Sequence, residues 1–266
     1  MSEYLPEPEP ELFPRLDDDP RWVRQIPEGT LIARIFRASG AYPVEWHEFR
    51  SFGPLDGRFD PHPLPVGDHE GVGVMYGVLE SSVGAPAGAS AGDASAGDAS
   101  GGRRTVDGVA SGGDGAARAA ASSEIGTHGA LEGPFAAALL EVFQAQRMIR
   151  LRDGAPTLAA FEVRRPLRLL DLSDSDWITV AGGNSAISSG DRERSRLWAR
   201  AIAERYPELD GVVSASSLIP TSRVVALWAG AADALPEHPT ALLRLDRDEL
   251  LGVIDRIAER YGYLVL

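Results

Sequence analysis

No cysteine occurs among the 266 residues, so neither disulfide bonds nor thiolate ligands can contribute to this fold. Histidine is scarce as well: five are present, and no two have the spacing that binds zinc on one helix. The sequence therefore predicts no metal site, and it excludes chemistry that needs a cysteine nucleophile.

Long apolar runs and basic clusters are also missing. No apolar run approaches the roughly 20 residues that cross a bilayer. The first 20 residues have neither a basic start nor an apolar centre, so we expect no secretion signal. The net charge of −13 disfavours a general nucleic-acid binder, because phosphate contact needs clustered cations. We expect a cytoplasmic protein that binds neither membranes nor nucleic acids.

With 44% hydrophobic and 24% charged residues, the composition is typical of a globular protein with a substantial core. Residues 1–28 are rich in Pro, Glu and Asp and predict an extended acidic tail that lies over the domain.

Residues 84–130 contain little besides Gly, Ala, Ser and Asp and include the near-repeat ASAGDASAGDAS. Such a segment buries too little apolar surface to offset the entropy of ordering. We expect one domain over 29–266, interrupted by this disordered insertion. A linker between two domains is the weaker alternative, because 29–83 holds too few strands for a core.

Periodicity predicts a mixture of strands and helices. Strands are expected at 31–38, 71–79, 157–165, 167–173, 177–181, 211–216, 223–229, 241–246 and 263–266. Helices are expected from Pro134, over 189–207 and over 246–262, where Gly262 is the stop signal. The run at 71–79 is apolar on both faces and indicates an internal strand. Without a regular βαβ alternation, the fold class is α+β.

Two charged residues break apolar patterns. Arg34 shares a strand face with Ile32 and Phe36. An arginine whose head reaches solvent or pairs with a structural acid is the simpler interpretation; a planar donor fork aimed at a carboxylate or phosphate is the functional one. Glu141 is the only acid in FAAALLEVF (135–143). It is either a solvated residue at the helix edge or a carboxylate that needs a partner, because burying it unpaired would cost several kcal/mol.

Two further residues carry a similar ambiguity. Tyr76 lies in the internal strand, where a core tyrosine bonded to a carbonyl and a stacking surface for a flat ligand are both plausible. Arg58 lies at the centre of the turn-rich segment PLDGRFDPHPLP (54–65). A loop arginine is usually solvated, but Arg58 together with Arg34 could clamp a diphosphate.

The order of these motifs resembles the RES domain family. RIFRA, GRFDP, VMYGV and ALLEVF follow one another, and SGDRERSRLWARAIAER, LDGVVSASS and VVALW are similar to the closing section of the family. The resemblance covers about 29–83 and 131–230. Family members are typically the toxin components of bacterial toxin–antitoxin pairs and are named for characteristic Arg, Glu and Ser residues.

The resemblance implies a fold similar to ADP-ribosyltransferases, a mixed sheet core with flanking helices. It also implies an activity that destroys NAD by hydrolysis or phosphorolysis and releases nicotinamide, with NAD as substrate and no cofactor. By motif, the family positions match Arg34, Arg58, Tyr76, Glu141 and Ser216.

The chain departs from the family pattern at several points. Ser214 stands where an aromatic residue is common, and Ser217 is an adjacent alternative to Ser216. GRFD replaces the commoner GRWN, which affects the contacts of that loop. The insertion separates Tyr76 from the acid; Glu80 is an alternative acid, but no helix follows it.

In this interpretation Glu141 accepts a hydrogen bond from a ribose hydroxyl and stabilises the developing oxocarbenium ion. Arg34 and Arg58 hold the diphosphate, Tyr76 packs against the nicotinamide or ribose, and Ser216 orients the ribose or the amide. The alternatives are transfer of ADP-ribose to a protein, a non-catalytic interaction domain, and an unrelated α+β domain that matches by chance. A small antitoxin partner is implied by resemblance only. The acceptor in this interpretation is either water or phosphate. The sequence does not determine the oligomeric state, and a homo-oligomer is one of the possibilities.

Overall fold

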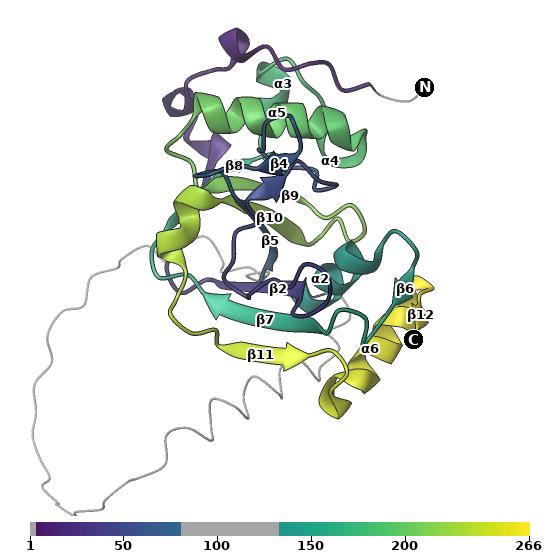
Figure 1. Cartoon of the computed structure of the whole chain (residues 1–266). Helices are drawn as coiled ribbons and strands as arrows, with labels where there is room; N and C mark the ends of the chain where they lie inside the picture. Colours follow the sequence, from purple (N-terminus) through teal and green to yellow (C-terminus); the bar gives the residue numbers. More distant parts are fainter. Residues whose placement is uncertain (1–3, 81–132) are drawn as a thin grey trace, which may run out of the picture.

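The computed structural model describes residues 4–80 and 133–266 (Figure 1). In these residues an eight-stranded sheet runs in the order β1-β8-β9-β10-β5-β2-β7-β11. Neighbouring strands are antiparallel except β8 and β9, which are parallel. Its strands are β1 (Val23–Ile26), β2 (Leu31–Arg37), β5 (Val74–Leu79), β7 (Pro156–Glu162), β8 (Leu167–Asp171), β9 (Gly211–Ala215), β10 (Arg223–Trp228) and β11 (Ala241–Arg244). The α+β class predicted from the sequence is confirmed.

Helices and two small strand pairs surround this sheet. The helices are α2 (Pro134–Phe143), α3 (Trp177–Val180), α4 (Ala186–Ser189), α5 (Arg192–Arg205) and α6 (Asp248–Tyr261). The short 3-10 turns are η1 (Pro10–Leu12), η2 (Leu16–Asp18), η3 (Pro20–Trp22) and η5 (Ala229–Ala234). β3 (Phe52–Gly53) pairs with β4 (Gly67–Asp68), and β6 (Met148–Ile149) pairs with β12 (Leu264–Val265). In Figure 1, α3, α4 and α5 lie near one end of the large sheet, and α2 and α6 near the other.

Local signals in the sequence explain the three longer helices. Pro134 occupies the first turn of α2, where its missing N–H costs nothing. The Asp191 carboxylate caps α5 by accepting a hydrogen bond from the Arg194 N–H at 3.0 Å. Gly262 ends α6 with φ +70°, a conformation that glycine adopts without strain. All three helices, and the internal position of β5 between β10 and β2, agree with the sequence prediction.

The strand predicted at 177–181 is wrong, because Trp177–Val180 forms the short helix α3. The β-branched residues of WITV favour a strand, but the preceding turn reverses the chain. There the Asp171 carboxylate accepts hydrogen bonds from the N–H groups of Ser173 and Asp174 at 2.9 and 2.8 Å. The turn carries Trp177 into a fully buried position, and this tertiary packing outweighs local propensity.

The N-terminal segment lies over the domain, but it packs into the core and is not an extended tail. Buried side chains anchor it: Leu5, Phe13, Leu16 and Trp22. Regular structure also begins earlier than the predicted strand at 31–38, because β1 pairs with β8 at the edge of the sheet. Isolated apolar residues between prolines show neither helical nor strand periodicity, so the sequence pattern did not reveal them. The insertion predicted at 84–130 lies outside the described residues.

The core consists of three clusters of buried side chains. One joins the N-terminal segment and α3–α5 to the sheet, and the second joins α2 and α6 to it. The third lies on the opposite face of the sheet, where Met75 and Leu79 meet η5. Within the described ranges, every helix is too short or too polar to cross a bilayer.

Phe13 provides a test of the N-terminal packing. Its ring stacks on Trp198 with centroids 5.4 Å apart and planes 18° apart. We expect Phe13→Ala to lower the free energy of unfolding by about 3–5 kcal/mol, because it leaves a cavity among aromatic rings. The neighbouring residue Leu12 is 57% exposed, so Leu12→Ala should change stability by less than about 0.5 kcal/mol. Urea unfolding measures both, and equal effects would contradict this packing.

Candidate functional site

A cavity lies over the sheet where β2 and β5 separate. The two strands pair only at Ile32–Leu79 and Ala33–Val78, although β2 continues along β7 and β5 along β10. The cavity has a volume of about 500 Å³, within the usual range for small-molecule sites. Four predicted site residues line it, namely Arg34, Arg58, Tyr76 and Glu141. Side chains far apart in sequence thus meet in one cavity.

The Glu141 carboxylate is held from two sides. Its Oε1 accepts hydrogen bonds from the Ser216 hydroxyl at 2.6 Å and from the Ser217 N–H at 3.1 Å. Its Oε2 accepts one from the Gln144 side-chain amide at 3.2 Å. The residues before it in α2 are buried from Phe135 to Leu140, whereas Glu141 is only partly buried. Glu141, the acid in this apolar helix, is therefore hydrogen-bonded within the protein and also borders the cavity.

Ser216 and Ser217 have different positions. Ser216 is buried and is not among the residues that line the cavity. Besides donating to Glu141, its hydroxyl oxygen accepts hydrogen bonds from the N–H groups of Leu218 and Ile219 at 3.2 and 3.1 Å. Ser217 is exposed and lines the cavity. Ser216 thus positions the carboxylate, and Ser217 is the serine that a bound ligand would meet.

Arg58 reaches across to the start of α5. Its Nη1 donates to the Gly190 carbonyl at 2.7 Å and to the Ser195 hydroxyl at 3.2 Å. Among the described residues no carboxylate lies within ion-pair distance of it. Burial lowers the pKa of the Arg58 guanidinium, and the nearby charge of Arg192 lowers it further. The negative charges of Glu141 and Asp191 act in the opposite direction, and an anion bound beside Arg58 and Arg192 would add to their effect.

Tyr76 supports the loop that carries Arg58. Its hydroxyl oxygen accepts a hydrogen bond from the Phe59 N–H at 3.1 Å. A Cβ added at Gly57 would lie 2.4 Å from this oxygen, so a glycine is needed at this close approach. Burial raises the pKa of the Tyr76 phenol above its usual value. The phenol is therefore neutral at physiological pH and is not a base.

A buried carboxylate organises the same loop. Asp60 is fully buried and accepts hydrogen bonds from Arg50 Nη2 at 2.6 Å, from the Leu55 N–H at 2.9 Å and from the His62 N–H at 3.1 Å. Burial acts to raise the pKa of this carboxyl, but the hydrogen bonds from Arg50, Leu55 and His62 together hold it below its usual value. Asp60 is one of the two positions at which GRFD differs from the GRWN of RES domains, and here the acid has a partner in Arg50.

The structure matches neither of the two interpretations of Arg34 that the sequence suggests. The residue is 8% exposed, and its Nη1 donates to the carbonyls of Trp46 and Glu48 at 2.9 and 3.2 Å. Its Nε is buried without a hydrogen-bond partner in the part of the chain that is described. Burial lowers the pKa of Arg34 to about 10, so the group is still charged at neutral pH. Its guanidinium supports the 46–48 segment, and the residue is among those that line the cavity.

Sequence reasoning missed Arg192 and Gln144. Arg192 begins α5, lines the cavity and donates through Nη1 to the Asp56 carbonyl at 3.2 Å. A cation in the first turn of a helix opposes the helix dipole, and this signal is visible in the sequence after Asp191. Gln144 carries no comparable signal, because its role depends on the position of Glu141.

The cavity is cationic in a protein of net charge −13. The residues that line it include five arginines: Arg34, Arg37, Arg50, Arg58 and Arg192. Only two carboxylates, Asp56 and Glu141, accompany them. Arg50 is paired with Asp60, and Arg37 lies 4.0 Å from Asp153. Arg58 and Arg192, which have no ion-pair partner among the described residues, are the cations that a ligand would meet. Such a site favours an anionic ligand, and arginine forks suit phosphate groups in particular.

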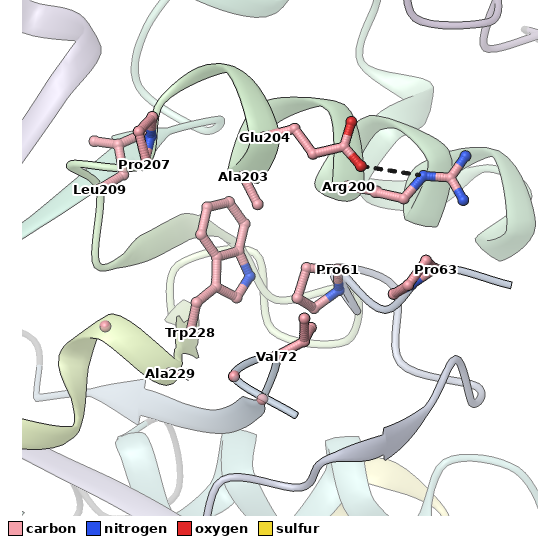
Figure 2. A pocket seen from close by; sticks show the side chains of 13 residues that line it. Pro61, Pro63, Val72, Arg200, Ala203, Glu204, Pro207, Leu209, Trp228 and Ala229 are labelled. Atoms are coloured by element: carbon pink, nitrogen blue, oxygen red, sulfur yellow. Dashed lines mark ion pairs between the residues drawn. The ribbon is translucent and has the colours of Figure 1, made fainter. Parts of the chain in front are cut away.

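A second, smaller cavity of about 330 Å³ lies beside the 54–65 loop. Figure 2 shows Trp228, Pro61 and Val72 around it, with the Arg200–Glu204 ion pair at its edge. Its lining is mainly apolar and includes none of the five predicted site residues. The larger cavity is therefore the candidate functional site.

Comparisons of this chain with protein-family models, curated proteins and solved structures find no match. The resemblance to RES domains therefore depends on the motifs and on the cavity that they form.

Asp60 allows the loop to be tested without touching the cavity lining. We expect Asp60→Asn to lower the free energy of unfolding by about 2–3 kcal/mol at pH 7, because it leaves the Arg50 charge without its partner. Asp56, an exposed acid of the same loop that borders the cavity, is the matched control for stability, and Asp56→Asn should lower the free energy of unfolding by less than about 0.5 kcal/mol.

The pH dependence of this difference has a defined sign. Because the pKa of Asp60 is lowered in the folded state, its contribution is full above the ordinary value of 3.8 and is lost as the pH falls through the folded value. The difference between the wild-type protein and Asp60→Asn should therefore shrink below about pH 4. A constant difference between pH 7 and pH 3 in urea unfolding would contradict this assignment.

Proposed function

We propose that the protein cleaves the bond between nicotinamide and ribose in NAD. The observation that carries this proposal is the shared cavity of a positioned carboxylate, Glu141, and two arginines without ion-pair partners among the described residues, Arg58 and Arg192. NAD supplies the matching chemistry, with a diphosphate for the guanidinium groups and ribose hydroxyls for the carboxylate.

The reaction breaks the bond from ribose C1′ to the pyridine nitrogen. Both bonding electrons leave with nicotinamide, which becomes neutral and needs no general acid. Positive charge develops on the ribose, as in other glycosidic cleavages. Glu141 accepts a hydrogen bond from a ribose hydroxyl, and this interaction strengthens as the charge develops. An oxygen of water or phosphate then bonds to C1′ and loses its proton.

The arginines orient the substrate. Arg58 and Arg192 lie near each other and bind the diphosphate, which replaces their mutual repulsion with charge-assisted hydrogen bonds. Arg34 is a lining residue whose guanidinium holds the 46–48 segment through the Trp46 and Glu48 carbonyls. Tyr76, as a neutral ring that lines the cavity, packs against the nicotinamide or ribose.

The resemblance to RES domains supports three related proposals. The mixed sheet with flanking helices is of the ADP-ribosyltransferase type, the physiological activity is that of a toxin, and a small antitoxin protein is the partner. Transfer of ADP-ribose to a protein would use the same bond cleavage with a different acceptor. Incubation with labelled NAD and lysate distinguishes the two, because transfer leaves the label on a macromolecule.

Glu141 is the residue whose replacement tests the function. We expect Glu141→Gln to reduce nicotinamide release from NAD by at least about 10²-fold, because a neutral amide does not stabilise the positive transition state. Glu80 is the matched control: it is exposed at the end of β5, and Glu80→Gln should retain wild-type turnover. Near-wild-type turnover in Glu141→Gln, with the fold verified by urea unfolding, would exclude the role of Glu141.

Ser216 should act through Glu141 and not on the substrate. We expect Ser216→Ala to lower kcat for NAD about tenfold while KM stays within about twofold, because Ser216 only positions the carboxylate. Ser216→Thr, which keeps the hydroxyl, should restore most of kcat. A rise in KM with unchanged kcat would instead place Ser216 in substrate binding.

A further inference from the structure

One exposed aromatic residue of the cavity has no role in the cleavage described above. Tyr42 lines the same cavity as Glu141 and Arg58, and its side chain is 89% exposed. It comes from the loop after β2, whereas Glu141, Arg58 and Ser217 come from α2, the 54–65 loop and the β9–β10 loop. The cavity therefore has an aromatic surface on a separate segment.

The loop that carries Tyr42 is anchored at both ends. The N–H groups of Ala38 and Ser39 donate to the carbonyls of Ala155 and Gly154 at 3.3 and 3.0 Å. At its other end the Val44 N–H donates to the Arg37 carbonyl at 3.0 Å. These bonds close the turn, so the backbone that carries Tyr42 is held at the edge of the cavity. An aromatic ring on such a loop offers contact area at a small cost in conformational entropy, because a tyrosine has only two side-chain torsions to fix.

We propose that Tyr42 is the stacking platform for the second base of the dinucleotide, a purine. This inference rests on the proposed function and extends it from bond cleavage to substrate selection. The reacting ribose and the diphosphate already have partners in Glu141, Arg58 and Arg192. What remains of a dinucleotide is a nucleoside with a flat base, and Tyr42 is a flat, uncovered ring on the lining. Base stacking on such a ring depends on the π-face and not on hydrogen bonding.

The consequence is a preference for dinucleotides over mononucleotides. A ligand that lacks the second nucleoside, such as nicotinamide mononucleotide, gains nothing from Tyr42. Tyr42 is a specificity residue in this assignment and does not touch the reacting atoms.

Equilibrium binding tests the inference independently of turnover. Titration calorimetry compares ADP, which carries the base, with inorganic pyrophosphate, which lacks it. We expect Tyr42→Ala to weaken ADP binding by about 5- to 100-fold, the range of one stacked base, and to leave pyrophosphate binding within about twofold. Tyr42→Phe should bind both ligands like the wild-type protein, because the ring is retained.

Tyr4 serves as the control for removing an exposed ring. It is 64% exposed and is not part of the cavity lining, so Tyr4→Ala should bind ADP and pyrophosphate normally. The inference is overturned if Tyr42→Ala binds ADP as the wild-type protein does, if pyrophosphate binding falls equally, or if the wild-type protein binds ADP no better than pyrophosphate.

Failure of this inference is distinct from failure of the proposed function. A protein that binds ADP through Tyr42 but releases no nicotinamide from NAD retains the base platform and loses the cleavage. A protein that cleaves NAD with the same KM in Tyr42→Ala retains the cleavage and loses the platform.

Discussion

The candidate site depends on the early separation of β2 from β5. If these two strands remained paired along their length, the sheet would be closed where the cavity now lies. They pair at two positions only, and each then continues with its other neighbour. Beyond these positions β5 is bridged by Arg50, which pairs with Val74. Arg50 lies between the 46–48 segment, which Arg34 stabilises, and the 54–65 loop, which Asp60 and Tyr76 stabilise. Polar side chains therefore stabilise the loops at this point of the sheet, and two of these residues, Arg34 and Tyr76, also line the cavity.

Two kinds of polar interaction meet there. The Asp60 network satisfies its own charges, since carboxylate, guanidinium and backbone N–H groups are matched. Two arginines of the cavity lining are different, because Arg58 and Arg192 donate only to neutral acceptors among the described residues. Matched groups stabilise a fold, whereas partly buried charges bonded to neutral acceptors keep capacity for a charged ligand. This contrast, in a protein with strong overall negative charge, is the physical basis for assigning an anionic substrate.

Several features of the fold followed from local patterns. The proline at the start of α2, the acid that caps α5 and the glycine that ends α6 each act within one turn of the chain, so their effect is visible in the sequence. The N-terminal segment and α3 were misjudged for the opposite reason. Phe13 contacts Trp177, and Trp22 contacts Asp176 beside it, in each case more than 150 positions away in the sequence. Contacts between such distant residues leave no periodic signal.

The candidate site divides along the same line. Arg34, Arg58, Tyr76 and Glu141 are recognisable from the sequence, because a polar or charged group within an apolar run or a turn-rich loop is unusual and the order of the motifs is distinctive. The sequence also determined the strong negative charge and the absence of thiol chemistry. Only the tertiary structure decided that Glu141 is bound by Ser216, that Ser217 faces the cavity, and that Arg192 and Tyr42 belong to it. Those relations arise where separate loops converge on a gap between two strands. The position of the gap is set by the pairing of strands that lie far apart in the sequence, and no local sequence pattern encodes that pairing.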